Sequence, residues 1–320
     1  MKIRHLLFIS GLLMLGQTTI AQTGKNFVSI NHQYVQEPGS YEESNFEYDT
    51  RGRLIRAQTN DHVVDGSYSE ESVWITDYTY DEAAGTISSV STVATPVYTM
   101  NFTVNATLTG NRVTHMTIIQ DVPAYGYHSE DNMSMEYDAT GKVVKSDNTN
   151  DNGVTHNSSV IRWEDGNAVE TTETGEGETR VYNHIYDTTR PAPLNAKLAY
   201  LLMGMPVDIC ASQIMIGMYD YMGYTPKNLV VGVKHSRNGA TTSEKNFVYE
   251  FDADGDISRI ECYRNGTLTD TYVLGLTAAG VQEIEAEKTA APYYTLQGCQ
   301  TSAPRKGSVY IRNGHKVISR

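Results

Sequence analysis

Apolar and polar residues alternate along much of the chain with a period of two. The clearest stretch is 98–108, where threonine or asparagine separates successive apolar residues. A period of two is typical of a β-strand with one buried and one solvent-exposed face. The pattern therefore predicts that most of the chain forms half-buried β-strands. The apolar positions in this stretch are Tyr98, Met100, Phe102, Val104, Ala106 and Leu108.

One turn motif recurs between the predicted strands. Residues 46–55, 135–144 and 249–257 each run from a strand with an aromatic residue at its end, through Asp-x-x-Gly, into a new strand. The aspartate can accept hydrogen bonds from the backbone ahead of it, and the glycine tolerates a positive φ. We therefore expect a type I turn with a bulge that closes a β-hairpin at each position. The turn residues are Asp49, Gly52, Asp138, Gly141, Asp252 and Gly255.

The number of hairpins limits the possible architectures. Consecutive hairpins pair most simply with their neighbours in sequence, which gives an antiparallel meander. The chain has room for on the order of fifteen strands, and strand twist makes so large a sheet curl or close. We expect an all-β fold, a large antiparallel hairpin meander that is curled or barrel-like. The pattern leaves open whether the sheet closes.

Residues 194–222 break this alternation. The segment is apolar and rich in methionine, and leucines recur at helical spacing from Leu194 to Leu202. Pro206 ends the first predicted helix and Gly223 the second, so we expect an inserted helical hairpin. We favour a role in the core, in which the insert covers an open end of the sheet. The alternative is that the insert presents an adaptable contact surface to a partner or an apolar ligand. The residues concerned are Leu201, Met203, Met205, Met215, Met218, Tyr219 and Tyr221.

The two ends of the chain differ from the meander. Lys2 and Arg4 precede an apolar run that ends in small and polar residues, the pattern of a cleavable signal peptide. We expect cleavage between Ala21 and Gln22, and hence an exported protein of the periplasm, the cell surface or the extracellular space. The predicted organisation is a signal peptide (1–21), a meander domain (22–278), an acidic linker (279–291) and a basic C-terminal unit (292–320).

The net charge of −13 is unevenly distributed. Seven of the 25 Lys and Arg residues lie in the signal peptide or in the tail from Gly298, where no acidic residue occurs. This leaves 18 basic residues against 38 acidic ones in residues 22–297. Such a body repels nucleic acid and anionic membrane surfaces. A cation, a basic partner or a neutral glycan suits it better.

No residue pattern indicates a catalytic, metal or cofactor site, and we expect none of the three. Asp252, Asp254 and Asp256 alternate like the first ligands of a calcium loop, but Tyr263 stands where that loop places a bidentate glutamate. The histidines show no zinc-ligand spacing, and no serine-hydrolase motif occurs. Paired carboxylates for glycoside cleavage stay an alternative, because any two facing strands can present them.

The hairpin repeats, together with Tyr186-Asp187 and Pro226-Lys227-Asn228-Leu229, resemble a family of exported proteins from Gram-negative gut bacteria. That family is a domain of unknown function with a porin-like fold. The resemblance covers residues 27–277 and implies one curled β-meander without an assigned activity.

The tail is similar to the sorting signals of type nine secretion. The matching segments are 294–298, 304–307 and 310–317, and Cys299-Gln300-Thr301 departs from the pattern.

These patterns favour a non-enzymatic binding or structural protein of the bacterial cell envelope or surface. Its partner would be a glycan or another envelope protein, not nucleic acid, and it would not be an integral membrane protein. Two alternatives stay open. One is an outer-membrane β-barrel, which the strand at 98–108 suits in length, and the other is a glycan-active enzyme that uses paired carboxylates.

Overall fold

The computed structural model describes residues 26–65, 68–150, 155–175, 177–202 and 217–277, and four short strands nearer the C-terminus. The chain divides into two compact units, Met1–Gly280 and Val281–Arg320. The predicted signal peptide, with Ala21 and Gln22, lies outside the described residues, as does the predicted linker at 279–291.

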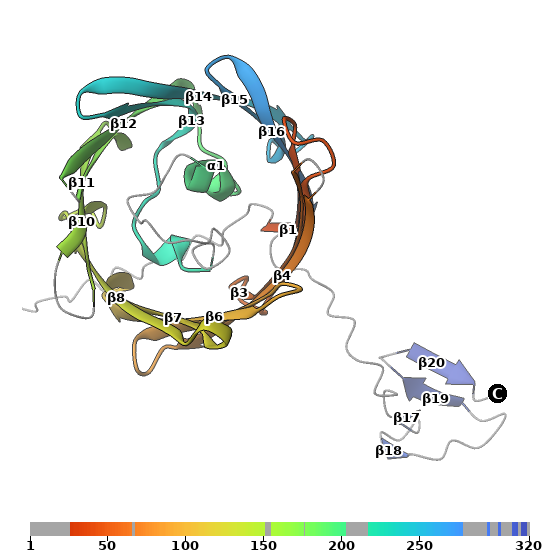
Figure 1. The fold of residues 1–320 in the computed structure, drawn as a ribbon. Helices are drawn as coiled ribbons and strands as arrows, with labels where there is room; N and C mark the ends of the chain where they lie inside the picture. Colours follow the sequence, from red (N-terminus) through yellow and green to blue (C-terminus); the bar gives the residue numbers. More distant parts are fainter. Residues whose placement is uncertain are drawn as a thin grey trace, which may run out of the picture. The chain divides into compact units, whose positions relative to one another are not determined.

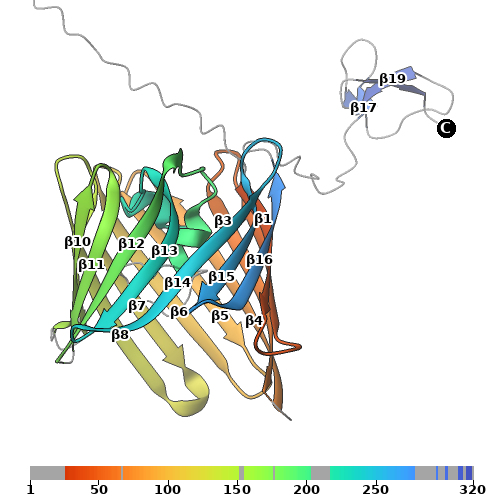
Figure 2. The ribbon, with the colours of Figure 1, turned by 90° about the horizontal axis from the view of Figure 1, so that it is seen from above.

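In the first unit, sixteen described strands form a closed antiparallel barrel in sequence order (Figures 1 and 2). Each strand pairs with the next, and the first closes the ring by pairing with the last, from Asn26 opposite Thr277 to Tyr34 opposite Asp270. This confirms the all-β meander. It also answers the question that the sequence left open, because the sheet closes.

The strands are β1 (Asn26–Tyr34), β2 (Tyr41–Tyr48), β3 (Leu54–Asp65), β4 (Tyr68–Asp81), β5 (Thr86–Ala94), β6 (Thr99–Thr109), β7 (Arg112–Val122), β8 (Tyr127–Tyr137), β9 (Val143–Asn150), β10 (Thr155–Glu164), β11 (Asn167–Gly175), β12 (Glu178–Pro191), β13 (Asn228–Arg237), β14 (Ala240–Phe251), β15 (Ile257–Arg264) and β16 (Thr267–Thr277). A short 3-10 helix, η1 (Pro123–Tyr125), joins β7 to β8.

The three Asp-x-x-Gly segments lie in the β2–β3, β8–β9 and β14–β15 turns. In each, one carboxylate oxygen of the aspartate accepts hydrogen bonds from two backbone N–H groups, at 2.8–3.0 Å. The glycines Gly52, Gly141 and Gly255 have φ values of 77°, 79° and 89°. All three turns connect an even-numbered strand to the next odd-numbered one, so they lie at the same end of the barrel. We call this end the mouth.

The segment between β12 and β13 also lies at the mouth and enters the barrel. Its described parts, residues 192–202 and 217–226, are called the plug. They contain helix α1 (Lys197–Leu202) and 3-10 helix η2 (Tyr219–Tyr221), and Figure 1 shows α1 inside the ring of strands. Ala199, Met218 and Tyr219 belong to the same buried cluster as side chains of the barrel wall. Residues 203–216 lie outside the described part, so the predicted helical hairpin is not confirmed.

The two faces of the barrel wall differ in polarity. In β8, the buried Met133 and Met135 point inward, and Asn132, Ser134 and Glu136 alternate with them on the outer face. The outer face of β6 carries only threonine and asparagine. Exposed valines occur on the outer wall as well, and these include Val73, Val90, Val160, Val248 and Val273.

Pairs between a lysine or arginine and an acidic residue of the neighbouring strand cross the outer wall at five described places, with N–O distances of 3.0–3.6 Å. The pairs are Arg56–Asp77, Glu136–Lys145, Arg162–Glu170, Lys234–Glu244 and Glu250–Arg259. Pairs as exposed as these add little stability. These pairs are informative because of where they lie, since they place full charges around the outside of the barrel.

The second unit contains a separate sheet of four short strands in the order β18-β17-β19-β20. They are β17 (Tyr293–Tyr294), β18 (Gln300–Thr301), β19 (Val309–Arg312) and β20 (His315–Ile318). Across the described part of the whole chain, every helix is too short or too polar to cross a membrane.

Candidate functional site

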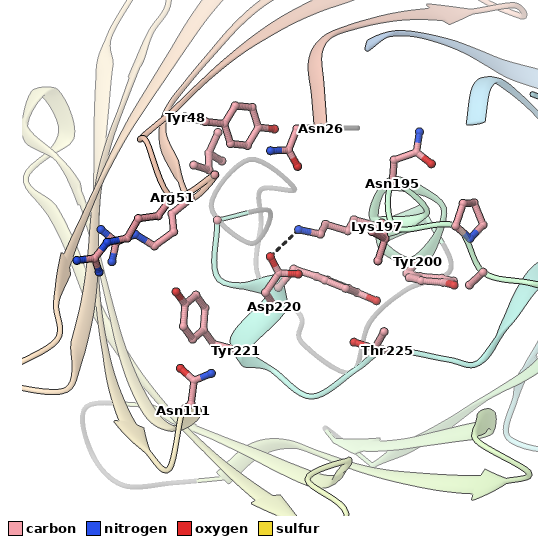
Figure 3. Close-up of a pocket in the computed structure, with 18 of the residues that line it drawn as sticks. Asn26, Tyr48, Arg51, Asn111, Asn195, Lys197, Tyr200, Asp220, Tyr221 and Thr225 are labelled. Atoms are coloured by element: carbon pink, nitrogen blue, oxygen red, sulfur yellow. Dashed lines mark hydrogen bonds and ion pairs between the residues drawn. The ribbon is translucent and has the colours of Figure 1, made fainter. Parts of the chain in front are cut away.

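A cavity of about 410 Å³ lies between the plug and the barrel wall (Figure 3). This mouth pocket is built from segments far apart in sequence: the start of β1, the β2–β3 turn, the end of β4, the β6–β7 turn and the plug. Its volume is within the range of ~300–1,000 Å³ that is usual for small-molecule sites.

Tyrosine is the commonest residue in the lining of the mouth pocket. Tyr48 and Tyr80 come from the ends of barrel strands, and Tyr200, Tyr219 and Tyr221 come from the plug. The hydroxyl of Tyr80 donates to the carbonyl of Leu54 at 2.8 Å, which fixes the ring against the wall. The rings of Tyr80 and Tyr221 lie 6.2 Å apart, one on the wall and one on the plug.

Among the described residues, one of these hydroxyl groups has no hydrogen-bond partner. Tyr200 is only 2% exposed, and its hydroxyl is buried without a hydrogen bond to any described residue. Burial, with the nearby Tyr224, raises the pKa of Tyr200, so the hydroxyl keeps its proton and can donate. The stacked ring of Tyr219, 6.1 Å away, differs because its hydroxyl donates to the carbonyl of Tyr224. A buried hydroxyl without a partner costs about 1–3 kcal/mol.

The charged groups of the pocket are paired with one another. Lys197 of α1 lies 2.6 Å from Asp220 of η2, as the dashed line in Figure 3 marks. Arg53 contacts Asp49 at 2.7 Å and Glu82 at 2.9 Å, and Arg51 also pairs with Glu82.

The pairing of Arg53 also affects Asp49 and Tyr80. Burial raises the pKa of Asp49, but hydrogen bonds from the backbone and side chain of Arg53 outweigh it, so the pKa lies below its usual value. The guanidinium of Arg53 lies 4.5 Å from the centroid of the Tyr80 ring. All three basic residues that line the mouth pocket thus have acidic partners, and the pocket presents little net charge.

A second hollow, of about 340 Å³, adjoins the mouth pocket on the side of β4 and the β6–β7 turn. Arg53, Tyr80, Asn111 and Tyr221 line both cavities. The two hollows therefore adjoin each other along the mouth and share these four residues as a common wall.

A different set of polar groups faces the barrel interior away from the mouth. His32 is buried, with its Nε2 3.1 Å from Asp270 and its Nδ1 3.7 Å from Glu42. Its ring stacks on Tyr272 at 4.1 Å. In the described residues, no group of three or more histidine, cysteine or acidic side chains is arranged to hold a metal ion.

The structure places only some of the residues singled out from sequence at this site. Gly52, Tyr219 and Tyr221 line the mouth pocket, and Asp49 supports it through Arg53. Met218 is buried core.

The other residues lie elsewhere or are not described. Asp138, Gly141, Asp252 and Gly255 lie in turns that do not line the mouth pocket. Leu201 lies in α1, but its side chain is outside the described part, as are Met203, Met205 and Met215.

Sequence reasoning missed Tyr48, Tyr80 and Tyr200. The signal for Tyr48 was present, since an aromatic residue ends the strand in each repeat of the turn motif. Tyr80-Asp81 repeats the same strand ending in a degenerate copy. No local signal marked Tyr200, because its role depends on how the plug packs.

No protein-family model matches the chain, and no curated protein sequence matches it. The solved structures that match the chain include two porin-like proteins of Bacteroides. One, from Bacteroides uniformis, is 14% identical, covers 80% of this chain and 98% of its own, and has a TM-score of 0.49. The other, from Bacteroides vulgatus, is 12% identical, covers 78% and 97%, and has a TM-score of 0.30. The closed barrel described above follows from the strand pairing of this chain itself.

Proposed function

We propose that the chain is an exported, non-enzymatic binding protein of the bacterial cell envelope that takes a small ligand in the mouth pocket. The observation that carries the proposal is the pocket itself, a defined cavity with convergent tyrosine rings and polar groups from five separate segments. Concave sites with a few oriented polar groups are the usual form of small-molecule sites.

The chemistry of the lining supports binding rather than catalysis. Glycoside cleavage needs two carboxyl groups, one of them free to give up a proton. Asp220 is the one acidic residue that lines the mouth pocket in the described part of the chain, and Lys197 neutralises it. Asp49 and Glu82 both pair with Arg53, and Glu82 lines the adjoining hollow together with Asp81.

The polarity of the outer wall supports the proposal that water surrounds the barrel. A membrane-spanning barrel carries a continuous apolar band about 25 Å tall on its outside. Here charged pairs such as Glu136–Lys145 and Lys234–Glu244 occupy that face, together with many threonines and asparagines. An outer-membrane barrel is the alternative that this observation disfavours.

A fragment screen of residues 22–320 with isotope-labelled tyrosine rings tests the binding site. We expect hits to shift the NMR signals of Tyr80 and Tyr221, assigned through Tyr→Phe variants. The signal of Tyr125 in η1, 66% exposed and at the end of the barrel away from the mouth, should stay unchanged and serves as the control. Each ligand should be recovered chemically unaltered. Hits that avoid the mouth tyrosines would contradict the proposed site, and turnover of a ligand there would contradict a non-enzymatic role.

A further inference from the structure

We propose that the mouth pocket and the adjoining hollow together recognise a neutral oligosaccharide. This inference rests on the proposed function and specifies its ligand class. Four features of the described residues carry it: compensated charge, aromatic surfaces, a buried hydroxyl without a partner and an extended shape.

The first feature is charge. Lys197 is paired with Asp220, and the two arginines of the β2–β3 turn are paired with Asp49 and Glu82. Asp81 adds one carboxylate in the adjoining hollow, where it accepts from the backbone N–H of Ala84 at 2.9 Å. An anionic ligand would have to displace one of these acids, and a cationic ligand one of the bases. A neutral ligand leaves every pair intact and still accepts hydrogen bonds from their N–H groups.

The second feature is the set of aromatic surfaces. The face of a tyrosine ring carries partial negative charge and attracts the weakly positive C–H groups of an apolar face. A sugar ring has such a C–H face and a rim of hydroxyls. The guanidinium of Arg53 covers one face of the Tyr80 ring at 4.5 Å. The ring of Tyr221 on the plug, 6.2 Å from Tyr80, lines both hollows and offers the aromatic surface.

The third feature is the hydroxyl of Tyr200. Tyr200 lines the mouth pocket, its hydroxyl is buried, and no described residue hydrogen-bonds to that hydroxyl. A hydroxyl both donates and accepts, so it matches another hydroxyl better than it matches an ion of one sign. Because this hydroxyl has almost no exposed surface, a sugar hydroxyl reaches it only when the Tyr200 ring shifts on binding, and the contact would then satisfy a polar group that the protein leaves unsatisfied.

The fourth feature is length. The hollows of about 410 and 340 Å³ share Arg53, Tyr80, Asn111 and Tyr221. A ligand that fills both must pass these shared residues, as an extended chain of linked rings does. A single compact metabolite would use one hollow and leave the other empty.

Titration calorimetry on residues 22–320 tests the inference. A glycan array of neutral hexose, pentose and N-acetylhexosamine oligomers first identifies the neutral hexasaccharide that binds best. Calorimetry then compares three probes, which are this hexasaccharide, hexagalacturonate and a neutral hexapeptide. We expect the neutral hexasaccharide to bind at least tenfold more tightly than the other two. Tyr221→Ala should weaken it at least tenfold, and Tyr125→Ala, the same change away from the mouth, should leave it unaltered.

Tyr200→Phe separates recognition from folding. Removal of an unpartnered hydroxyl should leave the melting temperature equal or higher, yet weaken the hexasaccharide about threefold to tenfold, the loss of one hydrogen bond. An unchanged affinity would overturn the assigned role of this hydroxyl.

The outcomes distinguish the two proposals. Tighter binding of hexagalacturonate or the hexapeptide, with sensitivity to Tyr221→Ala, would overturn the assignment of a neutral oligosaccharide and leave the mouth pocket as a binding site. Absence of binding to every neutral glycan on the array would also overturn the assignment. If the fragment screen in addition finds no ligand at the mouth tyrosines, the proposed function fails with it.

Discussion

Nε2 of His32 lies 3.1 Å from Oδ1 of Asp270, across the seam at which the first strand of the barrel pairs with the last. Glu42 of β2 lies on the other side of the imidazole, with 3.7 Å between Nδ1 and Oε2. The histidine therefore links β16, β1 and β2 at the place where the barrel closes.

This link predicts a pH dependence of stability. Burial lowers the pKa of His32, but the hydrogen bonds and charges of Asp270 and Glu42 outweigh it, so the pKa is raised above 6.5. Burial raises the pKa of Asp270, but His32 outweighs it, so that pKa is lowered. A raised histidine pKa stabilises the fold fully below pH 6.5 and loses its effect as pH rises through the folded-state value.

The lowered pKa of Asp270 acts in the opposite direction, since its contribution is lost as pH falls through the folded-state value. We expect the pair to stabilise most between about pH 4 and pH 6.5. Urea denaturation from pH 5 to pH 9 should show that His32→Gln loses more stability relative to wild type at pH 5.5 than at pH 9. A difference that does not vary with pH would contradict the link.

The turn glycines should be sensitive to substitution although they are at the surface. Gly141 has a φ of 79°, and an added Cβ would lie 3.4 Å from Nε of Arg112. We expect Gly141→Val to destabilise the protein by at least ~1 kcal/mol, because a β-branched residue is strained there. Ala139→Val, in the same turn at an exposed position without positive φ, should change stability by less than ~0.5 kcal/mol. Equal denaturation midpoints for the two variants would contradict the turn assignment.

The plug should be part of the core. Met218 is fully buried in the cluster that joins the plug to the wall, so Met218→Ala should cost about 2–5 kcal/mol. Leu194→Ala, at a 44% exposed position of the same segment, is the matched control and should cost much less. Chemical denaturation measures both, and a loss below ~1 kcal/mol for Met218→Ala would argue for a loosely attached segment.

Local chemistry explains which parts of the fold were predictable. The period-two pattern of 98–108 identified the inner face of β6, because Phe102, Val104 and Ala106 are buried and the residues between them are polar. Closure was not predictable, because the seam joins residues 238 positions apart, such as His32 and Asp270, and no local pattern specifies that register.

The candidate site was less predictable than the fold. The sequence pointed to Tyr219 and Tyr221 through the unusual composition of the insert. It gave no reason to bring them beside Tyr48 or Tyr80, since that proximity comes from the insertion of the plug into the barrel. The ion pair of Lys197 and Asp220 likewise joins residues 23 positions apart, so no helical spacing could have indicated it.

The C-terminal unit should be dispensable for folding of the barrel. Its strands form a sheet of their own, separate from the sixteen strands of the first unit. A chain that ends at Thr277 should therefore melt at the same temperature as residues 22–320. A lower melting temperature, or insoluble protein, would show that residues 278–320 contribute to the barrel core.

A binding protein in water and an outer-membrane barrel require opposite polarity on the outer face of the barrel. Membrane fractionation tests most directly which of the two this protein is. Charged pairs such as Arg162–Glu170 would cost free energy if they faced lipid, whereas they cost little when they are exposed to water. After expression of the full chain in a Gram-negative host, a carbonate wash should release the protein from the membrane pellet, and residues 22–320 should stay monodisperse without detergent. Protein that resists the wash and needs detergent to stay in solution would contradict the account.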